Sequence, residues 1–182
     1  MSRIHTPVSI SNAPEDAQPT LETVNNLLGS APNMFRIISN SPAALKGYVG
    51  FNSALGAGRL PVATREGIAL AVSEVNGCDY CLAAHTYLGQ NVAKLTSAEI
   101  ARNRQGRSSD VKADVAIRFA KSIAINRGQV DTSLFNEVKT AGYDEAQIVE
   151  IIAHVALNTM TNYVNEVLGT EIDFPIANEL AA

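Results

Sequence analysis

Two cysteines and one histidine lie within eight positions of one another near the middle of the chain. Cys78 and Cys81 are three residues apart, and His85 follows Cys81 by four. Residues three or four apart lie on one face of a helix. If the segment is helical, the imidazole can reach the Cys81 sulfur directly or through one water, and a disulfide between the cysteines is accessible. Cys78 would begin that helix, where free N–H groups and the helix dipole favour a thiolate.

These residue types suit the reduction of a peroxide by thiols. A thiolate attacks the peroxide oxygen, because the neutral thiol is a weak nucleophile. The resulting sulfenic acid condenses with a second thiol to a disulfide. A base must take the first proton, and an acid must protonate the leaving oxygen. Cys81, Cys78, His85 and one carboxylate would supply these four functions.

Glu66 is the candidate for that carboxylate because the segment around it is mostly apolar. A charged side chain near Ile68 and Leu70 needs a partner if it is buried. His85 can be that partner if the helices before and after the cysteine turn pack against each other. Glu74 is the alternative, but it lies nearer the end of its helix, where a solvated charge is expected.

A close cysteine pair could also be a buried structural pair or half of a zinc site. Zinc would need two further ligands. His85 could supply one, but the chain has no third cysteine, and His5 and His154 are remote in sequence. This shortage of ligands disfavours a metal site.

The last long helix carries further polar residues. We expect His154 to be a surface or interface histidine. Asn158, Asn162 and Tyr163 could line a pocket, although polar residues on helices usually have no such role. Tyr80, between the two cysteines, is expected to point off the Cys81 face and to pack.

The composition is that of a single globular domain. The chain has 182 residues, 46% of them hydrophobic, so a sizeable core is expected. The net charge is −4, and the positively charged residues are scattered along the chain. Trp is absent. Both observations argue against a nucleic-acid partner. No apolar run is long enough to span a bilayer, and the N-terminus has no apolar signal core. We therefore expect a cytoplasmic protein that binds neither nucleic acid nor membrane.

Apolar spacing and capping residues predict an all-α fold without strands. Helices are expected over residues 20–28, 42–55, 61–76, 78–88, 96–104, 110–126, 131–141 and 144–168. A thioredoxin fold is excluded because it needs strands around its cysteine pair. Residues 1–19 are interpreted as an extended N-terminal arm, disordered or packed on another subunit, and residues 20–182 as one helical domain. The inward side of the last helix is expected to carry Ile148, Ile151, Ile152, Val155, Val164 and Val167.

The residues from Glu66 onward resemble a known family. They read EGIALAVSEVNGCDYCLAAHTYLG, which resembles the core motif of the alkylhydroperoxidase D-like (AhpD-like) branch of the carboxymuconolactone decarboxylase family. The match covers Glu66, Cys78, Cys81 and His85 at the family spacing. The later segment EIIAHVALNTMTNYVNEVLGTEIDFP resembles the C-terminal helix of peroxidase-related members. The likeness covers most of residues 20–175.

The resemblance implies an all-α bundle built around a helical hairpin and assembled as trimers or hexamers. It implies that Cys81 is the peroxidatic thiol, that Cys78 resolves it, and that Glu66 and His85 relay the proton. It implies no metal or prosthetic group, and a lipoyl-type reductant. Two positions depart from the family pattern: Tyr80 replaces a histidine of the best-known peroxidase, and Glu166 stands where peroxidase-related members carry a histidine.

We therefore expect a thiol-dependent peroxidase whose partners are a peroxide, a dithiol or lipoyl-type reductant and further copies of the chain. The apolar helices, the arm and the tail together favour a homo-oligomer. Two alternatives remain. One is a lyase or decarboxylase acting on a lactone, which does not need the cysteine pair. The other is a non-catalytic redox sensor or disulfide carrier.

Overall fold

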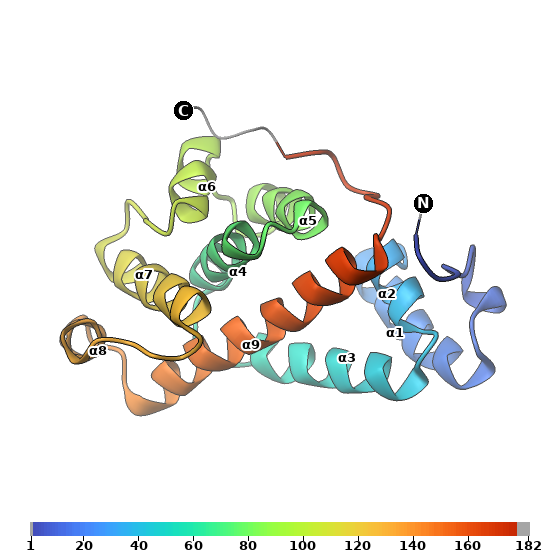
Figure 1. Cartoon of the computed structure of the whole chain (residues 1–182), viewed down its shortest axis with the longest axis horizontal. Coiled ribbons are helices and arrows are strands. Elements are labelled where there is room, and N and C mark those ends of the chain that lie inside the picture. The colour runs from blue at the N-terminus through green and yellow to red at the C-terminus, as the bar shows by residue number, and fades with distance from the viewer. Residues whose placement is uncertain (1, 178–182) are drawn as a thin grey trace.

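In the computed structural model, the chain folds into helices, and residues 2–177, the part that the structure describes, contain no β-strand (Figure 1). This confirms the predicted all-α fold. Residue 1 and residues 178–182, which belong to the predicted arm and domain, lie outside this range. Two 3₁₀ turns precede the helices, η1 (Ile10–Asn12) and η2 (Glu15–Ala17). The helices are α1 (Gln18–Leu28), α2 (Asn33–Ile38), α3 (Pro42–Gly56), α4 (Val62–Asn76), α5 (Asp79–Asn91), α6 (Ser97–Arg104), α7 (Val111–Asn126), α8 (Thr132–Thr140) and α9 (Glu145–Leu168).

The N-terminal segment is not uniformly extended, since it contains η1 and η2, and it packs on its own chain. The Arg36 guanidinium, on α2, donates hydrogen bonds to the carbonyls of Pro7 and Val8. The Asn40 side chain donates to the carbonyl of His5. At the other end, the Arg3 N–H donates to the carbonyl at the end of α9. The segment thereby joins α2 to the end of α9.

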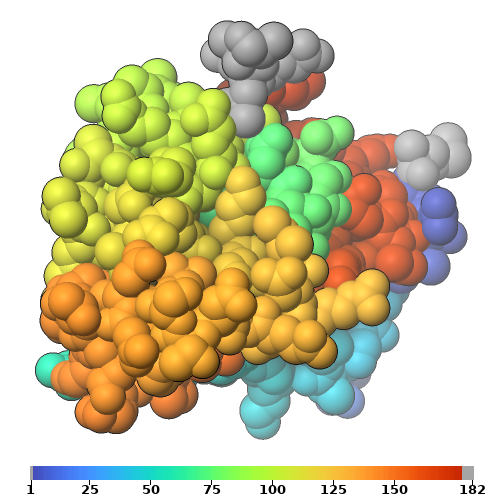
Figure 2. All heavy atoms as spheres, turned by 60° about the vertical axis from the view of Figure 1, so that its left-hand side comes forward, coloured from blue at the N-terminus to red at the C-terminus, as the bar shows by residue number. Residues whose placement is uncertain are grey.

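Helix α4 lies at the centre of the molecule and contacts α5, α6, α7 and α9 (Figure 1). All residues from Gly67 to Ser73 are buried, as expected for a helix that is apolar on most sides. Helix α9 runs diagonally along α4 in Figure 1, with α3 on its other side. Figure 2 shows the face on which α6, α7 and α8 form a continuous surface over this core.

Helices α4 and α5 form the predicted helical hairpin, and its turn is set by Gly77. This glycine adopts a left-handed conformation, with φ of +64°, which ends α4. The N–H of Cys78 then donates back to the carbonyl of Ser73 at 3.0 Å. Cys78 is left as the N-cap of α5, with extended backbone. The turn therefore fixes where the cysteine pair begins.

Helix α9 begins with a capping box formed by Asp144 and Gln147 and ends at Gly169. Its buried side carries a row of polar residues: His154, Asn158, Thr161, Asn162 and Asn165. Its outer side exposes four large apolar or aromatic residues: Val149, Ile152, Tyr163 and Val167. The prediction that Ile152 and Val167 point inward is thus wrong. The homo-oligomer stays a prediction.

Among the described residues, no helix combines the length and the apolar character that crossing a bilayer requires. The cytoplasmic location stays a prediction.

Close packing of α4 against α7 gives a stability prediction. A Cβ added at Gly67 would lie 2.4 Å from the Ile117 Cδ1 atom, which is itself buried. Overpacking of this kind costs about 1–3 kcal/mol, which exceeds the gain in helix propensity of up to about 1 kcal/mol. Gly67→Ala should therefore lower the free energy of unfolding, measured by urea denaturation.

Gly50→Ala on α3 is the matched control, because a Cβ there meets open space. That variant should be as stable as the wild type or more stable, by up to about 1 kcal/mol. A Gly67→Ala variant at least as stable as Gly50→Ala would contradict the packing described here.

Candidate active site

Both cysteines are buried, and both thiols are free. Cys78 lies at the N-cap of α5, and its sulfur accepts a hydrogen bond from the Cys81 N–H at 3.4 Å. The two side chains also hydrogen-bond to each other. The predicted adjacency of the two sulfurs on one helix face is therefore present in the structure.

The negative charge of the pair is stabilised on Cys81. The hydrogen bond from the Cys78 thiol lowers the pKa of Cys81 below its usual range, against the effect of burial. His85 and the amides of Asn165 and Asn162 lower the pKa of Cys81 further. The pKa of Cys78 is raised, first by its hydrogen bond to Cys81 and then by burial. The expectation that the helix start favours a thiolate at Cys78 is therefore wrong, because the thiolate is stabilised at Cys81, one helical turn later.

Two asparagines of α9 bring hydrogen-bond donors to this sulfur. Asn165 Nδ2 donates to Cys81 Sγ at 3.2 Å. Asn162 is held by Asn76 Nδ2, which donates to its Oδ1 at 2.8 Å, and by Ser73 Oγ, to which its own Nδ2 donates at 3.2 Å. From the sequence, Asn162 was expected only as a residue that could line a pocket, and Asn165 was not expected at the site. Their signal was a spacing of three residues, which places both on one face of the last helix.

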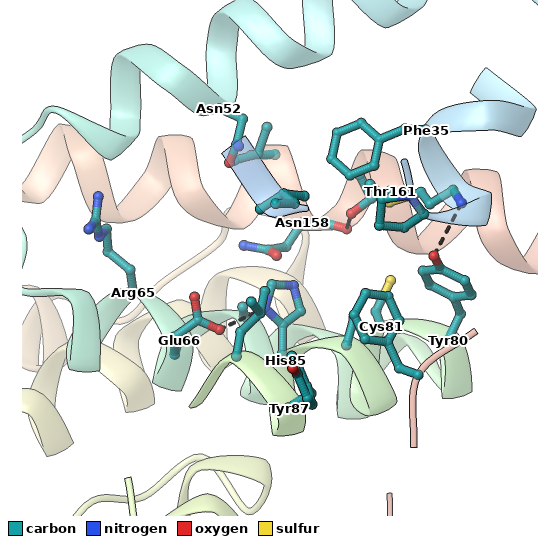
Figure 3. Close-up of a pocket in the computed structure, with 18 of the residues that line it drawn as sticks. Phe35, Asn52, Arg65, Glu66, Tyr80, Cys81, His85, Tyr87, Asn158 and Thr161 are labelled. Atoms are coloured by element: carbon teal, nitrogen blue, oxygen red, sulfur yellow. Dashed lines mark hydrogen bonds and ion pairs between the residues drawn. The ribbon is translucent and has the colours of Figure 1, made fainter. Parts of the chain in front are cut away.

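His85 and Glu66 meet as predicted. The His85 Nδ1 and Glu66 Oε2 atoms are 2.9 Å apart (Figure 3), and both side chains are mostly buried. Burial alone would lower the pKa of His85, but the Glu66 carboxylate outweighs it, so the pKa of His85 is raised. The alternative carboxylate, Glu74, instead pairs with Arg104 at 2.7 Å. Of these two carboxylates on α4, Glu66 therefore contacts His85 and Glu74 does not.

Tyr80 does more than pack. Its hydroxyl accepts a hydrogen bond from the Met34 N–H at 3.1 Å and donates to Asp173 Oδ1 at 2.8 Å. Its ring meets that of Phe174 edge to face. The segment after α9 is therefore fastened over the cysteine helix.

Cys81, His85 and Glu66 line a cavity of about 550 Å³. Its apolar and aromatic lining comes from α2, α3, α5, α9 and the C-terminal segment, and includes Met34, Phe35, Tyr48, Tyr87, Leu88, Leu157 and Phe174. In Figure 3, Phe35, Tyr80 and Cys81 lie toward one end, and Asn52, Arg65 and Glu66 toward the other. The cavity thus has the size and lining typical of a small-molecule pocket, with a thiol at one side.

His154 is not on the surface. It is only 6% exposed and lines the same cavity. Burial first, and then the neighbouring Arg65 charge, lower the pKa of His154 to about 4. The imidazole is therefore neutral at pH 7.

Within the described range, no group of three or more His, Cys, Asp and Glu side chains is arranged to hold a metal ion.

Comparison with known proteins gives a family match over part of the chain and several structures of similar fold. Residues 42–121 match the model of the carboxymuconolactone decarboxylase family. Among solved structures, the chain is similar to the AhpD core of an uncharacterized peroxidase-related protein from Ralstonia eutropha JMP134, with a TM-score of 0.83, 21% identity and coverage of 94% of this chain and 92% of that one. It is also similar to an uncharacterized peroxidase-related protein from Silicibacter sp. TM1040, with a TM-score of 0.80, 20% identity and coverage of 93% and 91%.

A third similar structure is a cysteine-to-alanine variant of the debrominase Bmp8 in complex with 2,3,4-tribromopyrrole. Its TM-score is 0.80, with 21% identity and coverage of 95% of this chain and 94% of that one. No curated protein matches the chain significantly. The family match thus covers residues 42–121, and the chain has the fold of the AhpD-like, peroxidase-related proteins.

The contact between α9 and Cys81 gives a pH prediction. Asn165→Leu removes the amide donor and keeps a side chain of similar size. A hydrogen bond to a charged group is worth about 1.5–3 kcal/mol, which corresponds to about one to two pKa units. The thiolate should therefore form at higher pH in the variant. The measurement is the pH dependence of Cys81 alkylation by iodoacetamide, located by peptide mass spectrometry.

In the wild type, the midpoint of that profile should lie below the ordinary thiol pKa of about 8.5. Asn136→Leu, an exposed substitution on α8, is the matched control and should leave the profile unchanged. Coincident profiles for Asn165→Leu and the control would refute a role of the amide at the sulfur.

Proposed function

We propose that the chain is a thiol-dependent peroxidase that reduces organic hydroperoxides or hydrogen peroxide, with Cys81 as the nucleophile and Cys78 as the resolving thiol. One observation carries the proposal. The Cys81 sulfur accepts hydrogen bonds from the Cys78 thiol and the Asn165 amide, and it lines a pocket that also contains the His85–Glu66 pair.

In the first step, the Cys81 thiolate attacks one peroxide oxygen and the O–O bond breaks. The sulfur is oxidised to a sulfenic acid, and the peroxide is reduced to an alkoxide or hydroxide. That leaving group takes a proton from the imidazolium of His85, whose raised pKa favours the protonated form. Glu66 holds the ring through its Nδ1 atom and balances the imidazolium charge.

In the second step, Cys78 attacks the sulfenic sulfur of Cys81. Its thiol has stayed protonated until then because the neighbouring thiolate raises its pKa. Once Cys81 is oxidised, that charge is gone, and the Cys78 thiol passes its proton to the sulfenic oxygen as its sulfur attacks. The sulfenic oxygen leaves as water, and the disulfide forms. A dithiol or lipoyl-type reductant restores both thiols and becomes a disulfide itself.

The alternatives use different parts of the site. A lyase acting on a lactone would not need the thiols. A redox sensor would form the disulfide once, without turnover in the presence of a dithiol. Neither alternative explains why a proton donor held by a carboxylate lies beside the reactive thiol in a pocket of organic-molecule size.

A second candidate is the reductive removal of a halogen from a small aromatic ring. It is supported by the likeness to the debrominase and by the aromatic lining from Phe35, Tyr48 and Phe174. In such a reaction the two thiols supply two electrons, the ring carbon gains a proton, the halide leaves, and a disulfide forms. Bromide release from a bromopyrrole with a dithiol, without peroxide consumption, would favour this candidate.

The peroxidase proposal predicts different losses for the two cysteines. With cumene hydroperoxide and a dihydrolipoyl reductant, Cys81→Ser should abolish peroxide consumption. Cys78→Ser should turn over at least about a hundredfold more slowly, because the sulfenic acid has no resolving thiol, and a dimedone-type probe should trap that acid on Cys81. Full activity of Cys81→Ser would sink the assignment.

The proton relay predicts an effect of the Glu66 charge. Glu66→Gln keeps the shape of the side chain but loses the charge that raises the pKa of His85. General acid–base assistance is worth about a hundred- to ten-thousand-fold in rate, so turnover should fall at least about tenfold. The alkylation profile of Cys81 should also move to higher pH, because a neutral imidazole stabilises the thiolate less.

Glu74→Gln is the matched control, since it lies on the same helix and pairs with Arg104 instead. It should keep wild-type turnover and the wild-type alkylation profile. If the two variants behave alike, Glu66 is only a structural charge.

A further inference from the structure

The cavity beside Cys81 is much larger than a peroxide group needs. Its volume of about 550 Å³ falls within the range of about 300–1,000 Å³ that is typical of small-molecule sites. Most of its lining is apolar or aromatic. The pocket is therefore suited to a hydroperoxide with a substantial organic body. The polar residues of the lining indicate which other functional groups that molecule has.

Arg65 is a pocket-lining cation that no carboxylate balances among the described residues. Its neighbour Glu66 is paired with His85, and no ion pair involves the Arg65 guanidinium. Arg65 Nη1 donates to the carbonyls of Leu55 at 3.3 Å and Gly56 at 2.5 Å, at the end of α3. A guanidinium has five N–H donors in a fork that matches a carboxylate. The Nε and Nη2 donors of Arg65 have no partner in this part of the chain.

Two uncharged polar residues share this end of the pocket with Arg65. Asn52, on α3, lines the pocket, and in Figure 3 it lies on the Arg65 side of Phe35. His154, on α9, is buried, and its Nε2 atom has no hydrogen-bond partner among the described residues. In the described part of the chain, the His154 Nε2 atom thus lacks a hydrogen-bond partner, and the Arg65 guanidinium lacks an ion-pair partner. This arrangement is expected where a bound ligand supplies the missing partners.

The opposite end of the pocket would repel an anion. It holds the Cys81 sulfur, which is the favoured site of negative charge, and the Asp173 carboxylate bound to Tyr80. In Figure 3, Arg65 lies on the far side of His85 from Cys81 and Tyr80. A ligand with one anionic group would therefore place that group at Arg65 and its opposite end at the thiol.

We propose that the pocket binds organic acids and that the substrate is an acid hydroperoxide. Its carboxylate pairs with Arg65, and its hydroperoxide group reaches Cys81. Its apolar body packs against Phe35, Tyr48 and Leu157. The hydroperoxide part rests on the proposed peroxidase function. The binding of the acid rests on the charge distribution in the pocket alone.

A binding experiment without peroxide tests the acid site. Isothermal titration of the reduced full chain compares 4-phenylbutyrate with its neutral amide, 4-phenylbutyramide. The acid should bind the wild type at least about tenfold more tightly, which corresponds to about 1.4 kcal/mol. Arg65→Met should remove this preference while leaving the affinity for the amide unchanged. Arg102→Met, an exposed arginine on α6, should behave as the wild type.

Two further measurements keep the test decisive. Arg65 also holds the end of α3, so Arg65→Lys is measured in parallel and should keep part of the preference, because the charge remains. In the wild type, the acid should slow alkylation of Cys81 more strongly than the amide does, which places the acid in this pocket.

Equal affinities of the wild type for acid and amide, or a preference that survives Arg65→Met, would overturn the proposal. A protein that prefers the acid but consumes no peroxide would refute the peroxidase function and leave the acid site standing.

Discussion

The hydrogen bonds to the Cys81 sulfur depend on three helices at once. Helix α5 supplies Cys81 and, at its N-cap, the Cys78 thiol. Helix α9 supplies Asn165, whose amide donates to the sulfur. Helix α4 contributes indirectly, because Ser73 and Asn76 hold the neighbouring Asn162. The packing of α4, α5 and α9 therefore adds the α9 amides to the Cys78 thiol as donors that lower the pKa of Cys81.

The same three helices shape the pocket and its polarity. Glu66 on α4 meets His85 on α5, so the two buried groups neutralise each other instead of leaving a lone charge in a low-dielectric site. The next residue in sequence, Arg65, is left as a cation at the rim of the cavity. The C-terminal segment adds Asp173 and Phe174 at the other end, fastened through Tyr80. One end of the pocket thus carries the Arg65 cation, and the other carries the Cys81 thiol and the Asp173 carboxylate.

Local sequence signals predicted the helices and the Glu66–His85 contact, and they failed where tertiary packing decides. Gly77 and the capping pair of Asp144 and Gln147 are local, so the hairpin and the start of the last helix could be placed. Helix α2 has only six residues and no side-chain cap, so no local signal in the sequence predicted it. His154 was expected at the surface, and Asn162 only as a residue that could line a pocket, because their surroundings depend on how α9 packs against α4 and α5. The distribution of charge between Cys78 and Cys81 likewise depends on Asn165, which is 84 positions from Cys81 in sequence.

The central claim is that Cys81 and Cys78 together form a two-electron peroxide-reducing centre. It is tested most directly by adding one equivalent of cumene hydroperoxide to the reduced wild-type chain, quenching with an alkylating agent and mapping the peptides by mass spectrometry. The account predicts that one peroxide is consumed per chain, that both cysteines escape alkylation, and that their peptide is two mass units lighter through a Cys78–Cys81 disulfide. Recovery of both cysteines in alkylated form, with the peroxide unconsumed, would contradict it.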